Sequence, residues 1–235
     1  MNLYPGTSGY SYKEWKGNFY PAKLPAAQML RHYAQQLPAV EINNTFYRLP
    51  TTSVLASWCE QVPPDFRFAI KAPRRITHIK RLKDTQDEVA YLLRALETLG
   101  ERLGVILFQL PPYLRKDLAC LKAFIDLLPD QTPAAFEFRA QSWFEDSVFE
   151  LLRARDFSLC IADTDEVQAA AIVATASWGY LRLRRAQYED AELVKWLSEI
   201  RVQPWKHAYV FFKHEDEGIG PKLAAQFLRL TPLPY

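Results

Sequence analysis

The chain has 235 residues, of which 49% are hydrophobic and 24% are charged, and its formal net charge is +2. This is the composition of an ordinary globular protein that is long enough to bury a sizeable core. The small net charge argues against a strong overall attraction to nucleic acid or to an anionic membrane, so any basic character must be local.

The cysteines and the apolar segments indicate the compartment. The three cysteines, Cys59, Cys120 and Cys160, show no metal-like or disulfide-framework spacing, which is typical of reduced thiols. The first residues lack the basic and apolar segments of a signal peptide. No apolar run approaches the roughly 20 residues that a spanning helix requires. We therefore expect a soluble, cytoplasmic protein without membrane contacts.

Strand-like runs alternate with helical patterns along the whole chain, as in βα repeats. In chain order, the predicted strands are Leu3–Ser8, Ala39–Asn43, Phe66–Lys71, Val105–Leu110, Ala134–Arg139, Ser158–Asp163, Gly179–Arg184 and Ala208–Lys213. The predicted helices are Ala26–Leu37, Ser53–Val62, Asp87–Leu99, Asp117–Leu128, Ser147–Arg155, Ala191–Ile200 and Pro221–Leu230. The Ala-rich segment Gln168–Ala176 is a weaker candidate for a short helix.

Eight strands that alternate with helices, without a linker, predict an α/β fold. We expect a closed (β/α)8 TIM-type barrel that forms a single domain over residues 1–235. A doubly wound open sheet is the alternative, because alternation alone does not prove closure. The first turn, Gly6–Gly9, lacks the third glycine of a dinucleotide-binding fingerprint.

Polar residues recur at the carboxyl ends of the predicted strands, where the active sites of such barrels lie. Taking strand alternation and strand ends together, we expect these side chains at the barrel mouth: Glu41, Asn43, Lys71, Gln109, Glu137, Arg139, Asp163, Arg182 and Arg184. Buried charges must pair with one another or bind a charged group. One interpretation is an ion-pair network that only plugs the barrel. The other is a pocket for an anion such as a phosphate or carboxylate, because cations outnumber carboxylates.

The loops that follow the strands add candidate residues. The segment from Lys71 to Lys83, both included, holds six lysines and arginines with His78 among them, and this run could track a phosphodiester backbone or steer a small anion. The Gly6–Tyr10 turn offers backbone N–H groups and hydroxyls that can cradle an oxyanion. Several aromatic side chains just beyond strand ends could stack on a base or sugar. These are Tyr10, Tyr12, Trp15, Phe46, Tyr47 and Trp143.

Histidine is scarce, and only His78 and His214 of the four are placed for chemistry. A zinc or di-metal hydrolase usually has more nitrogen ligands. Carboxylates alone could hold Mg²⁺ or Mn²⁺, although the neighbouring arginines compete for them. A divalent metal is therefore not favoured, and no other cofactor is indicated.

Several motifs together resemble a known family. They are Gly6-Thr7-Ser8-Gly9-Tyr10-Ser11-Tyr12, the run from Val40 to Pro50 (VEINNTFYRLP), Thr77-His78, Phe108-Gln109-Leu110-Pro111-Pro112, Glu137-Phe138-Arg139, Ala162-Asp163 and Tyr180-Leu181-Arg182-Leu183. With them the chain resembles the YecE-like family, domain of unknown function 72, over nearly its whole length. The resemblance implies a TIM-type barrel and no established activity.

The chain also departs from that family's pattern. Arg184-Arg185 follow the seventh strand where the family typically has His-Gly, and Lys213–Gly218 replace an asparagine-rich turn after the eighth. These changes make the predicted pocket more cationic. They put in doubt any acid–base or metal role for the family at that position.

Three functional hypotheses follow from these residues. The first is an enzyme, a hydrolase or isomerase of TIM-barrel type, acting on a sugar phosphate, a nucleic acid or another anionic substrate. Arg139, Arg182 and Arg184 would hold the anion, and Glu137 or Glu41 would be the general base. Asp163 would orient a partner or bind a metal, and His78 would donate a proton. The second is a non-catalytic module that binds nucleic acid or a metabolite. The third is an inert barrel that serves as a scaffold for a partner.

Overall fold

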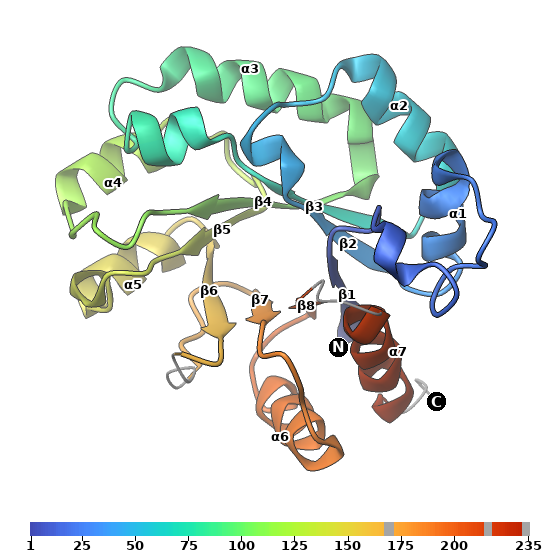
Figure 1. The fold of residues 1–235 in the computed structure, drawn as a ribbon. Coiled ribbons are helices and arrows are strands. Elements are labelled where there is room, and N and C mark those ends of the chain that lie inside the picture. Colours follow the sequence, from blue (N-terminus) through green and yellow to red (C-terminus); the bar gives the residue numbers. More distant parts are fainter. Residues whose placement is uncertain (167–171, 214–217, 232–235) are drawn as a thin grey trace.

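Eight parallel strands close into a barrel in the order in which they occur in the chain, as the computed structural model shows (Figure 1). The structure describes residues 1–166, 172–213 and 218–231. The strands are β1 Asn2–Ser8, β2 Ala39–Ile42, β3 Arg67–Lys71, β4 Leu103–Gln109, β5 Ala134–Glu137, β6 Ser158–Asp163, β7 Trp178–Leu183 and β8 His207–Phe212. Because β1 pairs with both β2 and β8, the predicted closed barrel is confirmed and the open sheet is excluded.

Helices follow the strands and surround the barrel. They are α1 Met29–Ala34, α2 Thr52–Gln61, α3 Gln86–Leu96, α4 Leu118–Ile125, α5 Asp146–Arg153, α6 Asp190–Arg201 and α7 Ile219–Leu230. The predicted first helix is shorter than expected, because its first residues form a 3-10 turn at Ala26–Gln28. Residues 172–176 are not helical, and the rest of the predicted helix Gln168–Ala176 lies outside the described residues.

Shorter helical turns continue several strands into their loops. They are the 3-10 turns Lys13–Trp15, Asn44–Phe46 and Gln141–Trp143, and the π-helical turn Arg75–Ile79 after β3; a further 3-10 turn, Glu97–Arg102, joins α3 to β4. Two of these turns, after β2 and β3, place side chains at the mouth of the barrel. Within the described part of the chain, no helix has both the length and the apolarity to cross a membrane.

The barrel interior is filled unevenly. Small residues such as Ala39, Ala69 and Ala135 face inward from β2, β3 and β5, whereas large aromatic rings face inward from β7 and β8. The rings fill the space that the alanines leave, so the interior is a packed core and not a channel. Above this aromatic layer the inward positions become polar, and these positions build the site.

Candidate functional site

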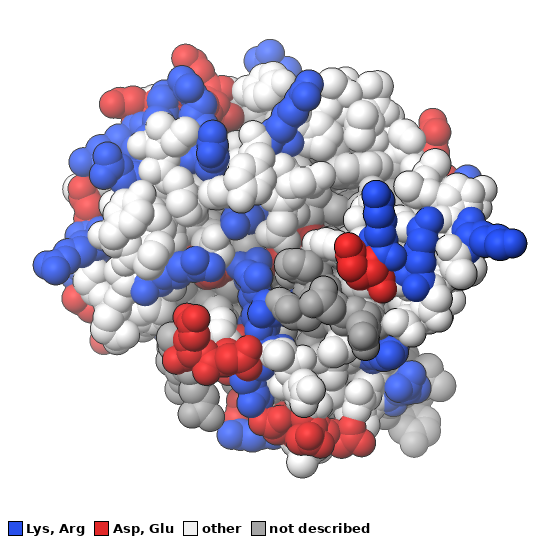
Figure 2. Space-filling model, in the orientation of Figure 1, with Lys and Arg blue, Asp and Glu red and all other residues white. Residues whose placement is uncertain are grey.

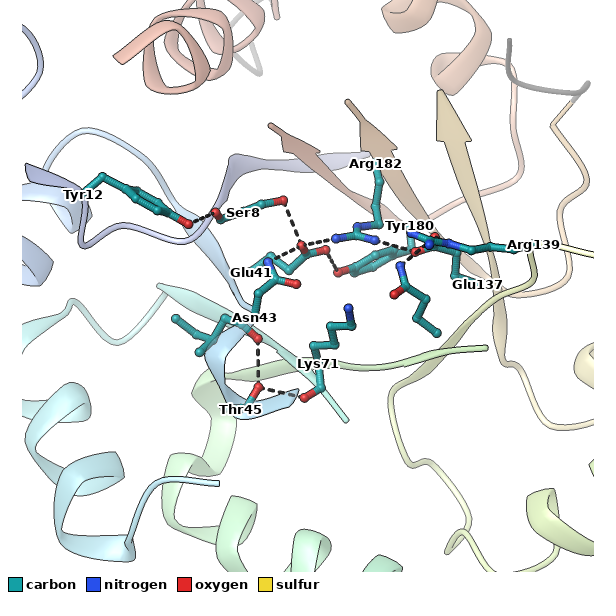
Figure 3. A network of polar contacts seen from close by, with 12 residues as sticks. Ser8, Tyr12, Glu41, Asn43, Thr45, Lys71, Glu137, Arg139, Tyr180 and Arg182 are labelled. Carbon is teal, nitrogen blue, oxygen red and sulfur yellow. Dashed lines mark hydrogen bonds and ion pairs between the residues drawn. The ribbon is translucent and has the colours of Figure 1, made fainter. Parts of the chain in front are cut away.

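A buried arginine joins two buried glutamates at the carboxyl ends of the strands (Figure 3). Arg182 on β7 donates from Nη2 to Glu41 Oε1 at 2.8 Å and from Nη1 to Glu137 Oε2 at 2.6 Å. The exposed fractions of the three side chains are 1%, 0% and 4%. Because β2, β5 and β7 each contribute one member, this triad depends on closure of the barrel.

The carboxylate of Glu41 is fully engaged by its neighbours. Besides Arg182, Oε1 accepts hydrogen bonds from Ser8 Oγ at 2.9 Å and from Asn43 Nδ2 at 2.8 Å. The hydroxyl of Tyr180, two residues before Arg182, donates to Oε2 at 2.7 Å. Four donors therefore hold one carboxylate in place.

Glu137 has a similar but more open environment. Its Oε1 accepts from Gln109 Nε2 at 2.8 Å and from Arg139 Nε at 3.1 Å. The side chain of Arg139 is 43% exposed, so this arginine reaches the solvent side of the network.

The charge on Arg182 sets the protonation of both carboxylates. Burial alone would raise their pKa values, but the guanidinium and the hydrogen bonds outweigh it and lower the pKa of Glu41 and of Glu137 to about 2. A carboxylate with so low a pKa and with its lone pairs engaged is a weak proton acceptor at neutral pH. The geometry therefore favours a positioning role for both glutamates over the predicted role of general base.

Two further cations enter the mouth, and among the described residues neither forms an ion pair. Lys71, at the end of β3, places Nζ 4.2 Å from the ring centroid of Phe46, and its carbonyl accepts from Thr45 Oγ1. Burial, followed by the neighbouring Arg182 charge, lowers the pKa of Lys71 to about 8. Burial and Arg182 also lower the pKa of Arg184.

These side chains form what we call the mouth cluster. It consists of Ser8, Glu41, Asn43, Lys71, Gln109, Glu137, Arg139, Tyr180, Arg182 and Arg184. With four cations against two carboxylates, the cluster carries an excess of two positive charges, counting only these described residues. Figure 2 shows Lys and Arg atoms near the middle of the face at which the strands end.

A rim of aromatic and cationic side chains borders the cluster. His78, on the π-helical turn, lies with its ring centroid 4.8 Å from that of Phe46, and its Nδ1 is 2.9 Å from Thr77 Oγ1. Burial, and then the Lys71 charge, lowers the pKa of His78. Tyr47 is 75% exposed, and the guanidinium of Arg74 lies 6.0 Å from its ring centroid.

Asp163 does not join the mouth cluster, although we expected it there. Along β6, Asp163 points to the same side of the strand as Leu159 and Ile161. Those two side chains pack in the outer core between the strands and the helices. Its Oδ2 accepts from Arg185 Nε at 2.9 Å and from Tyr188 Oη at 2.8 Å. The prediction took the last residue of β6 as inward-facing and overlooked the alternation along that strand.

The predicted binding aromatics mostly serve as packing. Trp15 is 0% and Trp143 2% exposed, so neither presents a ring to a ligand. Trp143 stacks on Phe138 at 4.7 Å and donates to the Leu114 carbonyl. Tyr10 is half-buried, and burial raises its pKa. Of the six aromatic side chains predicted to stack on a ligand, Tyr47 alone is well exposed.

Ser8 and Tyr180 complete the network but were not predicted as site residues. Tyr180 could have been found, because it has the same alternation as Arg182. Ser8 is harder to recognise, because its partner Glu41 lies on the neighbouring strand. Tyr12 donates to the Ser8 carbonyl at 2.8 Å, and burial, followed by the Glu41 charge, raises its pKa to about 12.

The basic loop after β3 is partly neutralised. Arg75 Nε and Lys80 Nζ both contact the carboxylate of Glu88 on α3, at 2.7 and 2.9 Å. Lys83 lies 3.9 Å from Asp117. This pairing leaves less charge for a phosphodiester backbone than the sequence indicates.

Metal ligands do not gather in the described residues. Over residues 1–166, 172–213 and 218–231, no three His, Cys, Asp or Glu side chains are grouped to hold a metal ion. His214, the other histidine considered for chemistry, lies outside these ranges.

Comparisons with known proteins place these features in context. The family model described as "Protein of unknown function DUF72" matches residues 4–234. The UPF0759 protein YecE of Escherichia coli K12 is 31% identical over 72% of this chain and 61% of its own length, so the chain matches less than two thirds of that relative. The UPF0759 protein YunF of Bacillus subtilis is 22% identical over 99% of this chain and 96% of its own.

Solved structures agree in fold. A crystal structure of a DUF72 family protein from Thermotoga maritima is 27% identical, has a TM-score of 0.84, and covers 98% of this chain and 99% of its own. A crystal structure of a DUF72 family protein from Enterococcus faecalis is 20% identical, has a TM-score of 0.81, and covers 99% of this chain and 96% of its own. At this identity the likeness shows the fold alone.

Proposed function

Because the chain belongs to the DUF72 family, whose function is unknown, we propose a function from its own site: an enzyme that acts on a small phosphate- or carboxylate-bearing substrate at the barrel mouth. The resemblance predicted from the sequence motifs is confirmed by the family match. The family description names no activity, so the proposal depends on the residues of the mouth cluster.

The observation that carries the proposal is the unbalanced charge of that cluster. Its two carboxylates form ion pairs with Arg182 and Arg139, whereas Arg184 and Lys71 form no ion pair with any described residue. Half-buried cations without a counter-ion cost free energy, which an anionic guest would recover. Arg182 Nε adds a buried donor that no described residue satisfies.

The roles follow from how firmly each group is held. Glu41 and Glu137 fix the guanidinium of Arg182, so its charge needs no reorganisation when a substrate binds. Arg139 and Arg184 flank it and supply N–H donors suited to phosphate or carboxylate oxygens. The pKa of Lys71 is lowered to about 8, and that of His78 is lowered below its ordinary 6.5 by burial, so the imidazole is neutral at pH 7; these two groups are suited to proton transfer, His78 as a proton acceptor.

A thermal-shift series tests the anion site. Phosphate, sugar phosphates and dicarboxylates are compared with neutral sugars, using the wild type and R184Q. An anion whose free concentration is about 100 times its Kd increases the free energy of unfolding by roughly 2.7 kcal/mol. For a chain of this size that increase raises Tm by about 5–10 °C. We expect R184Q to lose most of that shift.

The matched control is R201Q, which removes an exposed arginine at the end of α6 and should leave the shift unchanged. R139Q serves as a second mouth variant if R184Q folds poorly, since Arg139 is partly exposed. Equal shifts in R184Q, R139Q and R201Q, or no shift with any anion, would contradict the proposal.

A non-catalytic module that binds single-stranded nucleic acid is the second candidate. The exposed Tyr47 ring under Arg74 favours it, because stacking on an aromatic side chain is how such modules hold bases. The ion pairs of Arg75 and Lys80 with Glu88 argue against nucleic-acid binding, because they leave less positive charge for a phosphodiester backbone. The salt dependence of binding separates the two candidates.

A further inference from the structure

The amino group of Lys71 is placed unlike that of a surface lysine. Lys71 lies two residues after Ala69, an inward-facing residue of β3, so its side chain also points into the barrel mouth, within the mouth cluster. Figure 3 shows the amino group directed toward the Glu41–Arg182–Glu137 network with no contact drawn to its nitrogen. The Phe46 ring, 4.2 Å from Nζ to centroid, lies against it.

Its surroundings favour a reactive amine. Partial burial and the positive charges of Arg182 and Arg139 disfavour the ammonium form of Lys71, and together they outweigh the negative charges of Glu137 and Glu41, so the pKa is lowered. The neutral amine is the nucleophile in lysine chemistry, so such an environment activates it. Exposed lysines such as Lys83, whose side chain is 66% exposed near Asp117, lack these features.

We propose that Lys71 condenses with the carbonyl group of a small anionic aldehyde or ketone to form an imine. The inference rests on the proposed anion site, because Arg139 and Arg184 would hold the phosphate or carboxylate of that substrate beside the amine. It narrows the substrate class from anions in general to anionic carbonyl compounds.

The chemistry balances without an additional oxidant or reductant. The lone pair of Nζ attacks the carbonyl carbon, the C=O π electrons move to oxygen, and a proton passes from the nitrogen to that oxygen to give a neutral carbinolamine. Transfer of a second proton to that hydroxyl lets it leave as water, while the nitrogen lone pair forms the C=N bond. His78 packs against the same Phe46 ring as Lys71, which makes it a candidate to carry these protons.

Reductive trapping tests the inference on the intact protein. Wild-type protein is incubated at pH 8 with dihydroxyacetone phosphate or pyruvate and sodium cyanoborohydride, and the modified lysines are mapped by peptide mass spectrometry. We expect Lys71 to be modified at least tenfold faster than Lys83. Dihydroxyacetone, the neutral match of the phosphate ester, should label Lys71 at least tenfold more slowly than the ester does.

The variants separate this inference from the proposed function. R184Q should abolish the preference for the phosphate ester, and K71R, which keeps the positive charge but has no nucleophilic amine, should lose the adduct. A thermal shift without faster labelling at Lys71 would overturn the imine while the anion site stands. Fast labelling of Lys71 by the neutral and anionic ketones alike, with no thermal shift, would overturn the anion site and the substrate class together.

Discussion

Arg182 is the residue on which the buried charges of the barrel depend. Replacing it with methionine leaves Glu41 and Glu137 buried without their main counter-charge. Removing one partner from a buried ion pair typically costs about 3–5 kcal/mol, so we expect R182M to lose that much free energy of unfolding in urea titrations. R139Q, which removes a partly exposed partner of the same carboxylate, should lose about 1 kcal/mol or less. Equal losses would show that Arg182 is not the central charge.

The same residue determines the response of stability to acid. In the wild type the pKa values of Glu41 and Glu137 are about 2, below their ordinary 4.5, so their contribution is present above pH 4.5 and is lost as the pH falls toward 2. In R182M burial dominates and raises both pKa values, so protonation relieves the buried charge. We therefore expect the free energy of unfolding of R182M to rise between pH 7 and pH 5, whereas that of the wild type stays flat. Urea unfolding followed by circular dichroism across this range measures both trends, and parallel trends in the two proteins would refute the charge assignment.

The composition of the site was predictable from single residues only in part. Alternation along a strand identified Glu41, Glu137 and Arg182 as inward-facing, because each follows an inward position by two residues. The partners of Arg182 could not be read in this way, since 141 residues separate it from Glu41 and 45 from Glu137. Trp143 was misjudged because a loop aromatic looks the same in sequence whether it binds a ligand or packs on a neighbour such as Phe138.

At the scale of the element, the strands were predicted better than the helices. Each predicted strand overlaps an observed one, because short β-rich runs between turn residues are a local signal. The first helix was overextended because apolar periodicity does not distinguish an α-helical from a 3-10 turn. Asp163 ends β6, but the alternation along that strand points its side chain away from the barrel interior. The end of a strand therefore predicts an inward-facing residue only when the alternation agrees.

The contact between β1 and β2 explains one glycine and yields a further prediction. Gly6 is paired with Ala39, and a Cβ at Gly6 would lie 2.0 Å from the Ala39 carbonyl oxygen. G6A must therefore move the strands apart, near the bond between Ser8 and Glu41. We expect it to lose about 3 kcal/mol of stability, as for other overpacked sites.

Gly100 provides the control for this substitution. Unlike Gly6, which lies within β1, Gly100 lies in the turn Glu97–Arg102, with φ +52 and ψ −133, and has nothing within 4 Å of an added Cβ. G100A should cost about 2 kcal/mol, the strain of a backbone conformation that residues other than glycine rarely adopt. Thermal unfolding of both variants measures the difference, and a G6A loss no larger than that of G100A would rule out close strand approach as the reason for glycine at position 6.

At the scale of the whole molecule, a net charge of only +2 gives a weak overall attraction for anions. Its excess positive charge at the mouth is local, and the basic loop is partly paired with Glu88 and Asp117. A small anion would contact only a few cations, so counter-ion release contributes little to its binding. We therefore expect the Kd for phosphate or a sugar phosphate to change less than about tenfold between 50 and 200 mM NaCl.

A nucleic acid would behave differently on the same protein. A single strand that contacts 6–10 phosphates loses about 10²–10⁴ in affinity over that range of salt, because each neutralised phosphate releases counter-ions. Fluorescence anisotropy with a labelled single-stranded oligonucleotide, beside calorimetry with a sugar phosphate, compares the two directly. E88Q would release Arg75 and Lys80 from their shared carboxylate and should strengthen oligonucleotide binding while leaving the sugar phosphate unaffected. Tight binding of the oligonucleotide by the wild type, with a steep salt dependence and no binding of small anions, would make nucleic-acid binding the better account of the barrel mouth.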